Sequence, residues 1–320
     1  MDRRTIIKSV LASIAAVAPV DAADRLAVAK EQKSGTSKTN GQSMPFIETT
    51  DGVSLFYRDW GAGSPLVFLA PWGLHSDWWE YQMAFLDSHG LRCIAYDRRG
   101  HGRSVEPVDG YEFDTLANDL NSVIEQLDLR GVMLVGQSMG CGEIVRYLSR
   151  HGASRIARIV MVAPITPLLL KTPDNPDGIG SDYLEKVREA LSTDRPHVIA
   201  GAAPAFFGAP KNPVSAEMME WWTAMLLECS LKVLLDLQRV FTVTDFRSEL
   251  HAISAPTLII HGDRDTSAPI DLTGRKTASL IPGSELKVYE DAAHGLAITH
   301  MDRLNRDLLQ FAKAEPRSRS

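Results

Sequence analysis

Short apolar runs alternate along most of this chain with longer segments of helical periodicity. The runs are continuous and rich in β-branched residues, which is typical of strands buried on both faces of a parallel sheet. Two earlier stretches, at 46–49 and 53–57, alternate apolar and polar residues and predict half-buried strands. Largely apolar runs predict further strands at 65–70, 91–96, 132–135, 156–163 and 257–261, and a last strand is predicted at 285–289.

The segments between these runs have the spacing of amphipathic helices. Helices are predicted at 78–89, 115–129, 139–148, 270–280 and 300–314. Strands that alternate with helices form βαβ units, so the pattern predicts an α/β fold, a mainly parallel sheet with helices on both faces. Neither an internal repeat nor a second domain is indicated.

The alternation breaks between residues 166 and 254. A proline-rich loop is followed there by helical patches with many aromatic and aliphatic side chains, including Phe206, Trp221 and Trp222. A helical, apolar block inserted between two strands predicts a lid over a pocket, with these three side chains lining it. The other interpretation is that they only fill the core of the lid itself.

Residues 1–22 have the features of a twin-arginine export signal. Arg3 and Arg4 precede an apolar run that is too short to span a bilayer, and a small-residue cleavage pattern ends near Ala22. The sequence therefore predicts a Tat-type signal and a periplasmic or secreted protein without a stable membrane anchor.

The rest of the chain divides into a linker, one domain and a tail. Residues 23–43 are polar and rich in Lys, Ser, Thr and Gly, which predicts a disordered linker. The domain is expected at 44–314, with a tail at 315–320. Translation from Met44 would give a cytoplasmic form instead.

Charge and cysteine content limit the kinds of partner. The formal net charge is −6 and the pI is near 5.9, which argues against nucleic-acid binding. The three cysteines form no disulfide framework, and no spacing resembles a metal site. The expected partner is a small molecule, no cofactor or metal is predicted, and a homo-oligomer is compatible with the sequence.

A candidate nucleophile stands between the predicted strand at 132–135 and the next helix. Ser138 lies in a Gly-x-Ser-x-Gly motif between Gly136 and Gly140. A serine turned out at the top of a sheet needs a sharp, strained turn, and flanking bulk would clash where strand and helix approach. An ordinary strand-to-helix turn is the alternative, but the strand and helix on either side favour the nucleophile.

Serine needs a base to take its proton and a carboxylate to orient that base. Functional groups of an open α/β sheet gather beyond the carboxyl ends of its strands, which selects His294 in the loop after the last strand. Asp263 and Asp265 both follow the strand at 257–261. Asp263 is expected to shape the turn, and Asp265 is preferred because it lies farther beyond the strand end and can reach toward His294, a choice that also rests in part on the family resemblance given below.

Two backbone N–H groups are expected to stabilise an oxyanion. One belongs to Met139, the residue after the nucleophile, and the other to the loop that follows the strand at 65–70. Leu74 is the candidate in that loop.

These segments resemble those of a known family. Gly-Gln-Ser138-Met-Gly, His-Gly-Asp-Arg-Asp265, Asp-Ala-Ala-His294-Gly and the segment 96–104 are similar to motifs of bacterial aryl esterases and cofactor-free haloperoxidases (perhydrolases) of the α/β-hydrolase fold. The order serine, acid, histidine along the chain is also that of the α/β-hydrolase fold. The similarity covers about residues 45–314.

The resemblance implies an α/β-hydrolase fold in which Ser138, Asp265 and His294 form the triad and Leu74 and Met139 donate to the oxyanion. Three features depart from the family pattern. Trp72, a further candidate pocket residue, stands where the family usually carries His, Cys141 stands where glycine is common, and the twin-arginine leader is atypical.

The sequence thus predicts a serine hydrolase that cleaves small, largely apolar aryl or alkyl esters, and lactones as a further class, through an acyl-enzyme. The alternative is a cofactor-free haloperoxidase or perhydrolase, in which hydrogen peroxide replaces water and a peracid forms. A hydrolase-fold binding protein without catalysis fits less well, because such proteins usually lose a triad position.

Overall fold

A computed structural model describes residues 45–314 of the chain. From Phe46 on, these residues belong to one unit. The predicted signal, linker and tail lie outside the described residues and stay predictions, as does the cellular location. Between residues 45 and 314, no helix is both long and apolar enough to cross a membrane.

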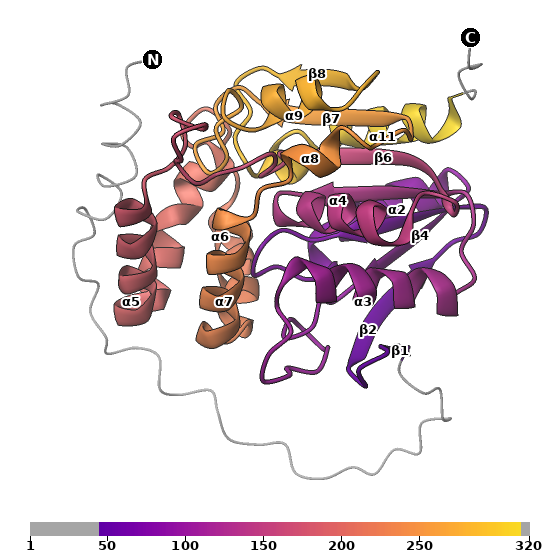
Figure 1. Cartoon of the computed structure of the whole chain (residues 1–320), viewed down its shortest axis with the longest axis horizontal. Coiled ribbons are helices and arrows are strands. Elements are labelled where there is room, and N and C mark those ends of the chain that lie inside the picture. Colours follow the sequence, from indigo (N-terminus) through magenta and orange to yellow (C-terminus); the bar gives the residue numbers. More distant parts are fainter. Residues whose placement is uncertain (1–44, 315–320) are drawn as a thin grey trace. The chain divides into compact units, whose positions relative to one another are not determined.

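An eight-stranded sheet forms the centre of the described chain (Figure 1), with the order β1-β2-β4-β3-β5-β6-β7-β8. β2 is antiparallel to β1 and to β4, and the other neighbours are parallel, which confirms the mainly parallel sheet. The strands are β1 (Phe46–Glu48), β2 (Ser54–Trp60), β3 (Ser64–Leu69), β4 (Leu91–Tyr96), β5 (Val132–Gln137), β6 (Ile156–Val162), β7 (Thr257–Gly262) and β8 (Glu285–Tyr289).

The crossover connections place helices on both faces of the sheet. β3 leads through α2 to β4 in one direction, whereas β4 leads through α3 to β5, and β5 through α4 to β6, in the other. Because such crossovers are right-handed, α2 lies on one face and α3 and α4 lie on the opposite face. The helices outside the insertion are η1 (Ser76–Trp79), α2 (Glu80–Ser88), α3 (Phe113–Gln126), α4 (Met139–His151), α9 (Gly274–Leu280), α10 (Leu296–Thr299) and α11 (Met301–Lys313), which packs on α2.

The reversal of direction creates a switch point between the neighbouring strands β3 and β5. Their connections leave toward opposite sides, so the loop after β3 and the turn after β5 border a crevice at the carboxyl edge of the sheet. Ligands of open α/β sheets bind at such a crevice. The candidate oxyanion loop and the candidate nucleophile therefore meet where the topology favours a site.

The predicted insertion between β6 and β7 is helical. α5 (Ser181–Phe207), α6 (Ala216–Glu228) and α7 (Leu231–Val243), here called the lid, stand together at one side of the sheet in Figure 1. The short α8 (Arg247–Leu250) leads back to β7. α5 is interrupted at Asp194, whose side chain accepts the His197 N–H and so begins its second half.

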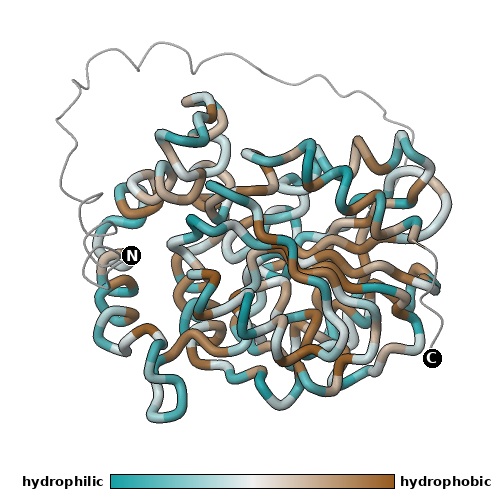
Figure 2. The backbone as a smooth tube through the Cα atoms, turned by 90° about the horizontal axis from the view of Figure 1, so that it is seen from above, coloured by the Kyte–Doolittle hydropathy of each residue, from teal (hydrophilic) through white to brown (hydrophobic). Residues whose placement is uncertain are grey.

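The core lies along the central strands. All six residues of β5 are buried, as are the last four of β3, and the tube in Figure 2 is brown along these strands. Continuous burial explains why the sequence of these strands is apolar without alternation.

Some elements differ from the predicted bounds for local reasons. β2 extends to Trp60 because its second half pairs with β4. α3 ends at Gln126, two residues before Asp128 takes a left-handed conformation with a φ of 42°. α9 begins only at Gly274, because Leu272 and Thr273 donate to the Pro269 carbonyl in a preceding turn.

Two glycines allow β5 and α4 to approach each other at the turn. A Cβ atom on Gly136 would lie 2.7 Å from the carbonyl group of Gly140, and one on Gly140 would lie 2.6 Å from the Leu69 oxygen at the end of β3. Real Cβ atoms essentially never show either approach. The motif glycines are therefore required by packing, as the sequence predicted.

Gly140→Ala is expected to lower the free energy of unfolding by about 1–3 kcal/mol, the usual cost of overpacking. The added Cβ atom would meet the backbone oxygen of Leu69, which cannot move without shifting the end of β3. Urea unfolding followed by circular dichroism measures this loss of stability. Gly180→Ala is the control, since nothing lies within 4 Å of its Cβ position and its φ is −65°. Equal stability of both variants would contradict the packing argument.

Candidate active site

Ser138 occupies a strained turn directly after β5. Its φ of 55° and ψ of −116° lie in a region that non-glycine residues rarely adopt, and its N–H donates to the Val162 carbonyl at 2.9 Å. Met139 is the first residue of α4, so its N–H has no partner within the helix. The side chain of Ser138 is thus presented at the positive end of a helix dipole.

His294 and Asp265 are joined by a short hydrogen bond. His294 Nδ1 lies 2.6 Å from Asp265 Oδ2, and both side chains are buried. Asp265 Oδ1 accepts the N–H groups of Ser267 and Ala268 at 2.9 and 2.8 Å, whereas Asp263 is exposed. The sequence assigned the side-chain hydrogen bonds that shape this turn to Asp263. In the structure Asp265 makes them instead.

A second imidazole lies against the same carboxylate. His261 Nε2 is 2.8 Å from the Ala268 carbonyl oxygen and 3.2 Å from Asp265 Oδ2, and its ring is fully buried. Burial alone would raise the pKa of Asp265, but the His294 and His261 imidazoles hold that pKa well below its usual range. Asp265 is therefore ionised, and each of its two carboxylate oxygens accepts a hydrogen bond.

Gln137 connects the serine turn to the loop after β8, residues 290–295. Its Nε2 donates to the His294 carbonyl oxygen at 2.8 Å, and its Oε1 accepts from Trp78 Nε1 at 2.7 Å. The Gln137 side chain is fully buried, so neither bond competes with water. The residue beside Ser138 thus fixes the backbone of His294.

The loop after β3, residues 70–75 and here called the β3 loop, carries the second predicted oxyanion donor. The Leu74 N–H donates to the Pro71 carbonyl at 3.3 Å, longer than the usual range of about 2.7–3.2 Å. Arg98 donates to the Ala70 carbonyl at 2.7 Å and, through Nε, to Glu143 of α4 at 2.8 Å. The buried Arg98 therefore ties the β3 loop to the helix that begins after Ser138.

Aromatic side chains of the lid reach His294. The rings of Phe206 and His294 are edge to face with centroids 5.5 Å apart. The ring centroids of Trp222 and Phe206 are 4.6 Å apart. Trp221 stacks on Trp78 at 6.0 Å. The fourth candidate pocket residue, Trp72, instead donates through Nε1 to the Leu234 carbonyl of α7 at 2.9 Å.

Cys141 packs in the first turn of α4. Its thiol is fully buried and donates to the Gly136 carbonyl at 3.2 Å. Burial raises the pKa of Cys141 well above its ordinary value, so the thiolate does not form near neutral pH.

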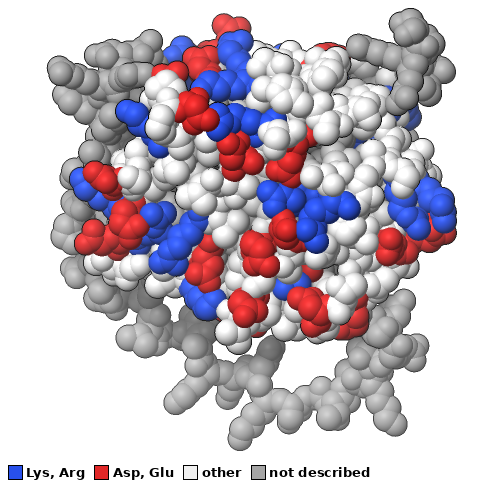
Figure 3. All heavy atoms as spheres, in the orientation of Figure 1, with Lys and Arg blue, Asp and Glu red and all other residues white. Residues whose placement is uncertain are grey.

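Charges of both signs are interspersed on the face of the molecule shown in Figure 3. Ion pairs also join neighbouring helices: Arg146 of α4 pairs with Asp114 of α3 and, at 2.7 Å, with Glu249 of α8. This face carries no basic patch of the kind that binds nucleic acid.

Sequence reasoning missed two residues at this site. Gln137 and His261 are polar residues inside otherwise apolar strands, and that interruption is a signal that could have identified them. A buried polar side chain needs partners, so its presence in a central strand marks a tertiary hydrogen bond.

The chain is similar to haloperoxidases and esterases from several bacteria. It is 42% identical over 272 residues to a non-heme chloroperoxidase of Kitasatospora aureofaciens, covering 84% of this chain and 99% of that protein. It is 35% identical over 277 residues to a bifunctional esterase/perhydrolase of Acinetobacter calcoaceticus, covering 85% and 100%. A solved bromoperoxidase from Bacillus anthracis matches with a TM-score of 0.82 and 36% identity, covering 85% and 100%. These are the enzyme classes that the sequence predicted.

The family model described as the alpha/beta hydrolase fold matches residues 64–301. This range runs from β3 to the first residue of α11 and includes Ser138, Asp265, His294 and the lid. The chain belongs to the alpha/beta hydrolase fold family.

Proposed function

We propose that this protein is a serine hydrolase that cleaves small, largely apolar carboxylic esters through an acyl-enzyme. The observation that carries the proposal is the 2.6 Å bond between Asp265 and His294, on a loop that Gln137 ties to the strained turn of Ser138. Esters of aryl and alkyl alcohols are the expected substrates, with lactones as a further class.

The tautomer of His294 determines its role. Because its Nδ1–H donates to the Asp265 anion, the neutral ring presents the lone pair of Nε2 as a base. His294 takes the proton as Ser138 Oγ attacks the ester carbonyl, and then gives it to the departing alcohol. Water resolves the acyl-enzyme in the second half, again with His294 as the base.

The oxyanion of each tetrahedral intermediate is stabilised by backbone donors. The Met139 N–H lacks a helical partner, and the Leu74 N–H makes only a long bond within its own turn. Each such donor contributes about 3–4 kcal/mol in the transition state of a comparable enzyme.

The lid favours an apolar substrate. Phe206 and Trp222 present aromatic surface beside His294, where an acyl or alcohol group would contact it. The similarity to relatives named as esterases supports the same substrate class.

The second candidate is a perhydrolase, favoured by similarity to relatives named as non-heme chloroperoxidases. Hydrogen peroxide would then replace water at the acyl-enzyme, giving a peracid and free Ser138. The peracid oxidises halide in solution and returns to the carboxylic acid, so the protein itself needs no redox group.

Ser138→Ala and His294→Ala are each expected to lower kcat for an aryl acetate by several orders of magnitude, about 10⁶-fold as in another serine hydrolase, with folding intact. Ser149→Ala, on the exposed side of α4, is the control and keeps wild-type rates. Near-normal rates in Ser138→Ala or His294→Ala would place the nucleophile or the base elsewhere. Inactivity of the wild type itself would favour a binding protein.

With acetate, hydrogen peroxide and bromide, the wild type is expected to brominate a phenol more slowly than it hydrolyses aryl acetate, and Ser138→Ala to do neither. Both rates are measured by absorbance at the same enzyme concentration. Bromination faster than ester hydrolysis would make the perhydrolase the main function, and bromination that survives in Ser138→Ala would exclude a shared acyl-enzyme.

Gln137→Leu is expected to lower both stability and kcat, because Trp78 Nε1 and the His294 carbonyl lose their buried partner. Each unsatisfied group costs about 1–3 kcal/mol of the free energy of unfolding. Denaturant unfolding and ester hydrolysis measure the two effects. Gln310→Leu, exposed on α11, is the control and should change stability by less than about 0.5 kcal/mol.

A further inference from the structure

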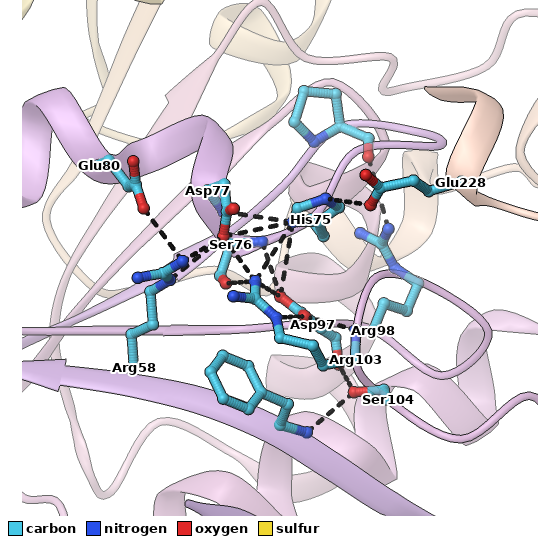
Figure 4. A network of polar contacts seen from close by, with 12 residues as sticks. Arg58, His75, Ser76, Asp77, Glu80, Asp97, Arg98, Arg103, Ser104 and Glu228 are labelled. Atoms are coloured by element: carbon cyan, nitrogen blue, oxygen red, sulfur yellow. Dashed lines mark hydrogen bonds and ion pairs between the residues drawn. The ribbon is translucent and has the colours of Figure 1, made fainter. Parts of the chain in front are cut away.

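Charged side chains at the end of β4 hold both ends of the β3 loop (Figure 4). Arg98 donates to the Ala70 carbonyl at 2.7 Å, and the Ser76 N–H donates to Asp97 Oδ1 at 2.9 Å. Asp97 is fully buried and also accepts from Arg103 Nε at 2.8 Å. Arg98 Nη1 also lies 3.5 Å from the Pro71 carbonyl oxygen, the acceptor of the Leu74 N–H, so these bonds fix the ends of the loop and reach Leu74 only through Pro71.

The lid holds the middle of the β3 loop. Trp72 Nε1 donates to the Leu234 carbonyl of α7, and a Cβ atom on Gly73 would collide with the side chains of Leu226 and Leu234. The third contact joins two polar side chains. His75 Nε2 lies 3.1 Å from Oε2 of Glu228, the last residue of α6.

The His75 ring is buried among charged groups. Its Nδ1 faces Asp77 at 3.5 Å, Asp97 at 3.9 Å and Arg103 Nη2 at 3.4 Å, as Figure 4 shows, and His101 is a further neighbour. Burial would lower the pKa of His75. The hydrogen bond to Asp77 and the charges of Asp97, Asp77 and Glu228 outweigh burial, so the pKa lies above its ordinary value.

We propose that His75 is a positioning residue, which holds the β3 loop to the lid through Glu228 and so sets the Leu74 N–H for the oxyanion. The inference rests on the proposed function, in which Leu74 is an oxyanion donor. In addition, the position of the Leu74 N–H depends on contacts with the lid as well as on contacts with the sheet.

The chemical consequence concerns the transition state. Gly73 and His75 flank Leu74 and both contact the lid, so a shift of either moves the Gly73–Leu74 peptide, whose N–H is now 3.3 Å from the Pro71 carbonyl. A donor acts on the oxyanion only at about 2.7–3.1 Å, a distance that small shifts abolish. Loosening the His75–Glu228 contact should therefore lower kcat and leave KM nearly unchanged.

Glu228→Gln tests the contact, because it keeps the size and the acceptor oxygen but removes the charge. The expected result is a two- to fivefold loss of kcat for an aryl acetate, about what a partly exposed ion pair contributes. Affinity for an alkylboronic acid, which places a charged oxygen in the oxyanion hole, should fall by the same factor. Glu220→Gln, exposed on α6, is the matched control and should change neither.

The pH dependence separates positioning from a general structural role. The imidazolium–carboxylate pair is present below the raised pKa of His75 and is lost as the pH rises through it. The kcat ratio of wild type to Glu228→Gln should therefore approach one at alkaline pH. A merely structural effect would give a ratio that does not depend on pH.

A double-mutant cycle completes the test. In a His75→Asn background, Glu228→Gln should have no further effect on kcat, and thermal unfolding shows that each variant is folded. Unchanged kcat in folded Glu228→Gln, or additive effects in the double variant, would overturn the positioning role while Ser138→Ala remains inactive. Ester hydrolysis that survives in Ser138→Ala would overturn the proposed function, and this inference with it.

Discussion

The close approach of β5 and α4 is the constraint on which the rest of the site depends. Gly140 lies against the Leu69 carbonyl, so the helix that follows Ser138 is seated directly on the end of β3. This contact lies two residues from the strained backbone of Ser138 and holds the start of α4 next to the strand that leads into the β3 loop. Strain of about 1–3 kcal/mol is sustained because β5 is paired along its length with β3 and β6.

Buried hydrogen bonds then attach each active-site loop to this rigid contact. Arg98 joins the Ala70 carbonyl to Glu143 of α4, Gln137 joins the serine turn to the His294 carbonyl, and Asp265 is held by donors on both oxygens. Side chains removed from water lose more when a partner is missing than exposed ones do. The loops are therefore positioned by satisfied buried polar groups, and not by their own backbone preferences.

Local patterns in the sequence predicted the sheet, the serine turn and the pairing of Asp265 with His294. The strands were recognisable because central strands are apolar throughout, and the turn because only glycine fits at two positions. The partners of Gln137, and the part that Asp265 plays in the turn in place of Asp263, were not recognisable. Gln137 and His294 are 157 residues apart in the sequence. Which of two neighbouring carboxylates accepts the N–H groups of a turn depends on how that turn packs in the folded protein. Such contacts are determined by the tertiary structure, whereas hydrophobic periodicity is a property of the local sequence.

The lid contacts both the loop of His294 and the β3 loop. At one end the Gly295 N–H donates to the Phe206 carbonyl at 2.7 Å, while the Phe206 ring packs on His294. At the other end α6 and α7 hold Trp72 and His75 of the β3 loop. Phe206, the proposed pocket residue, therefore also supports the loop that carries His294. The same helices thus form the apolar surface beside His294 and hold the loop that carries the Leu74 N–H, so in the proposed mechanism the lid acts on both.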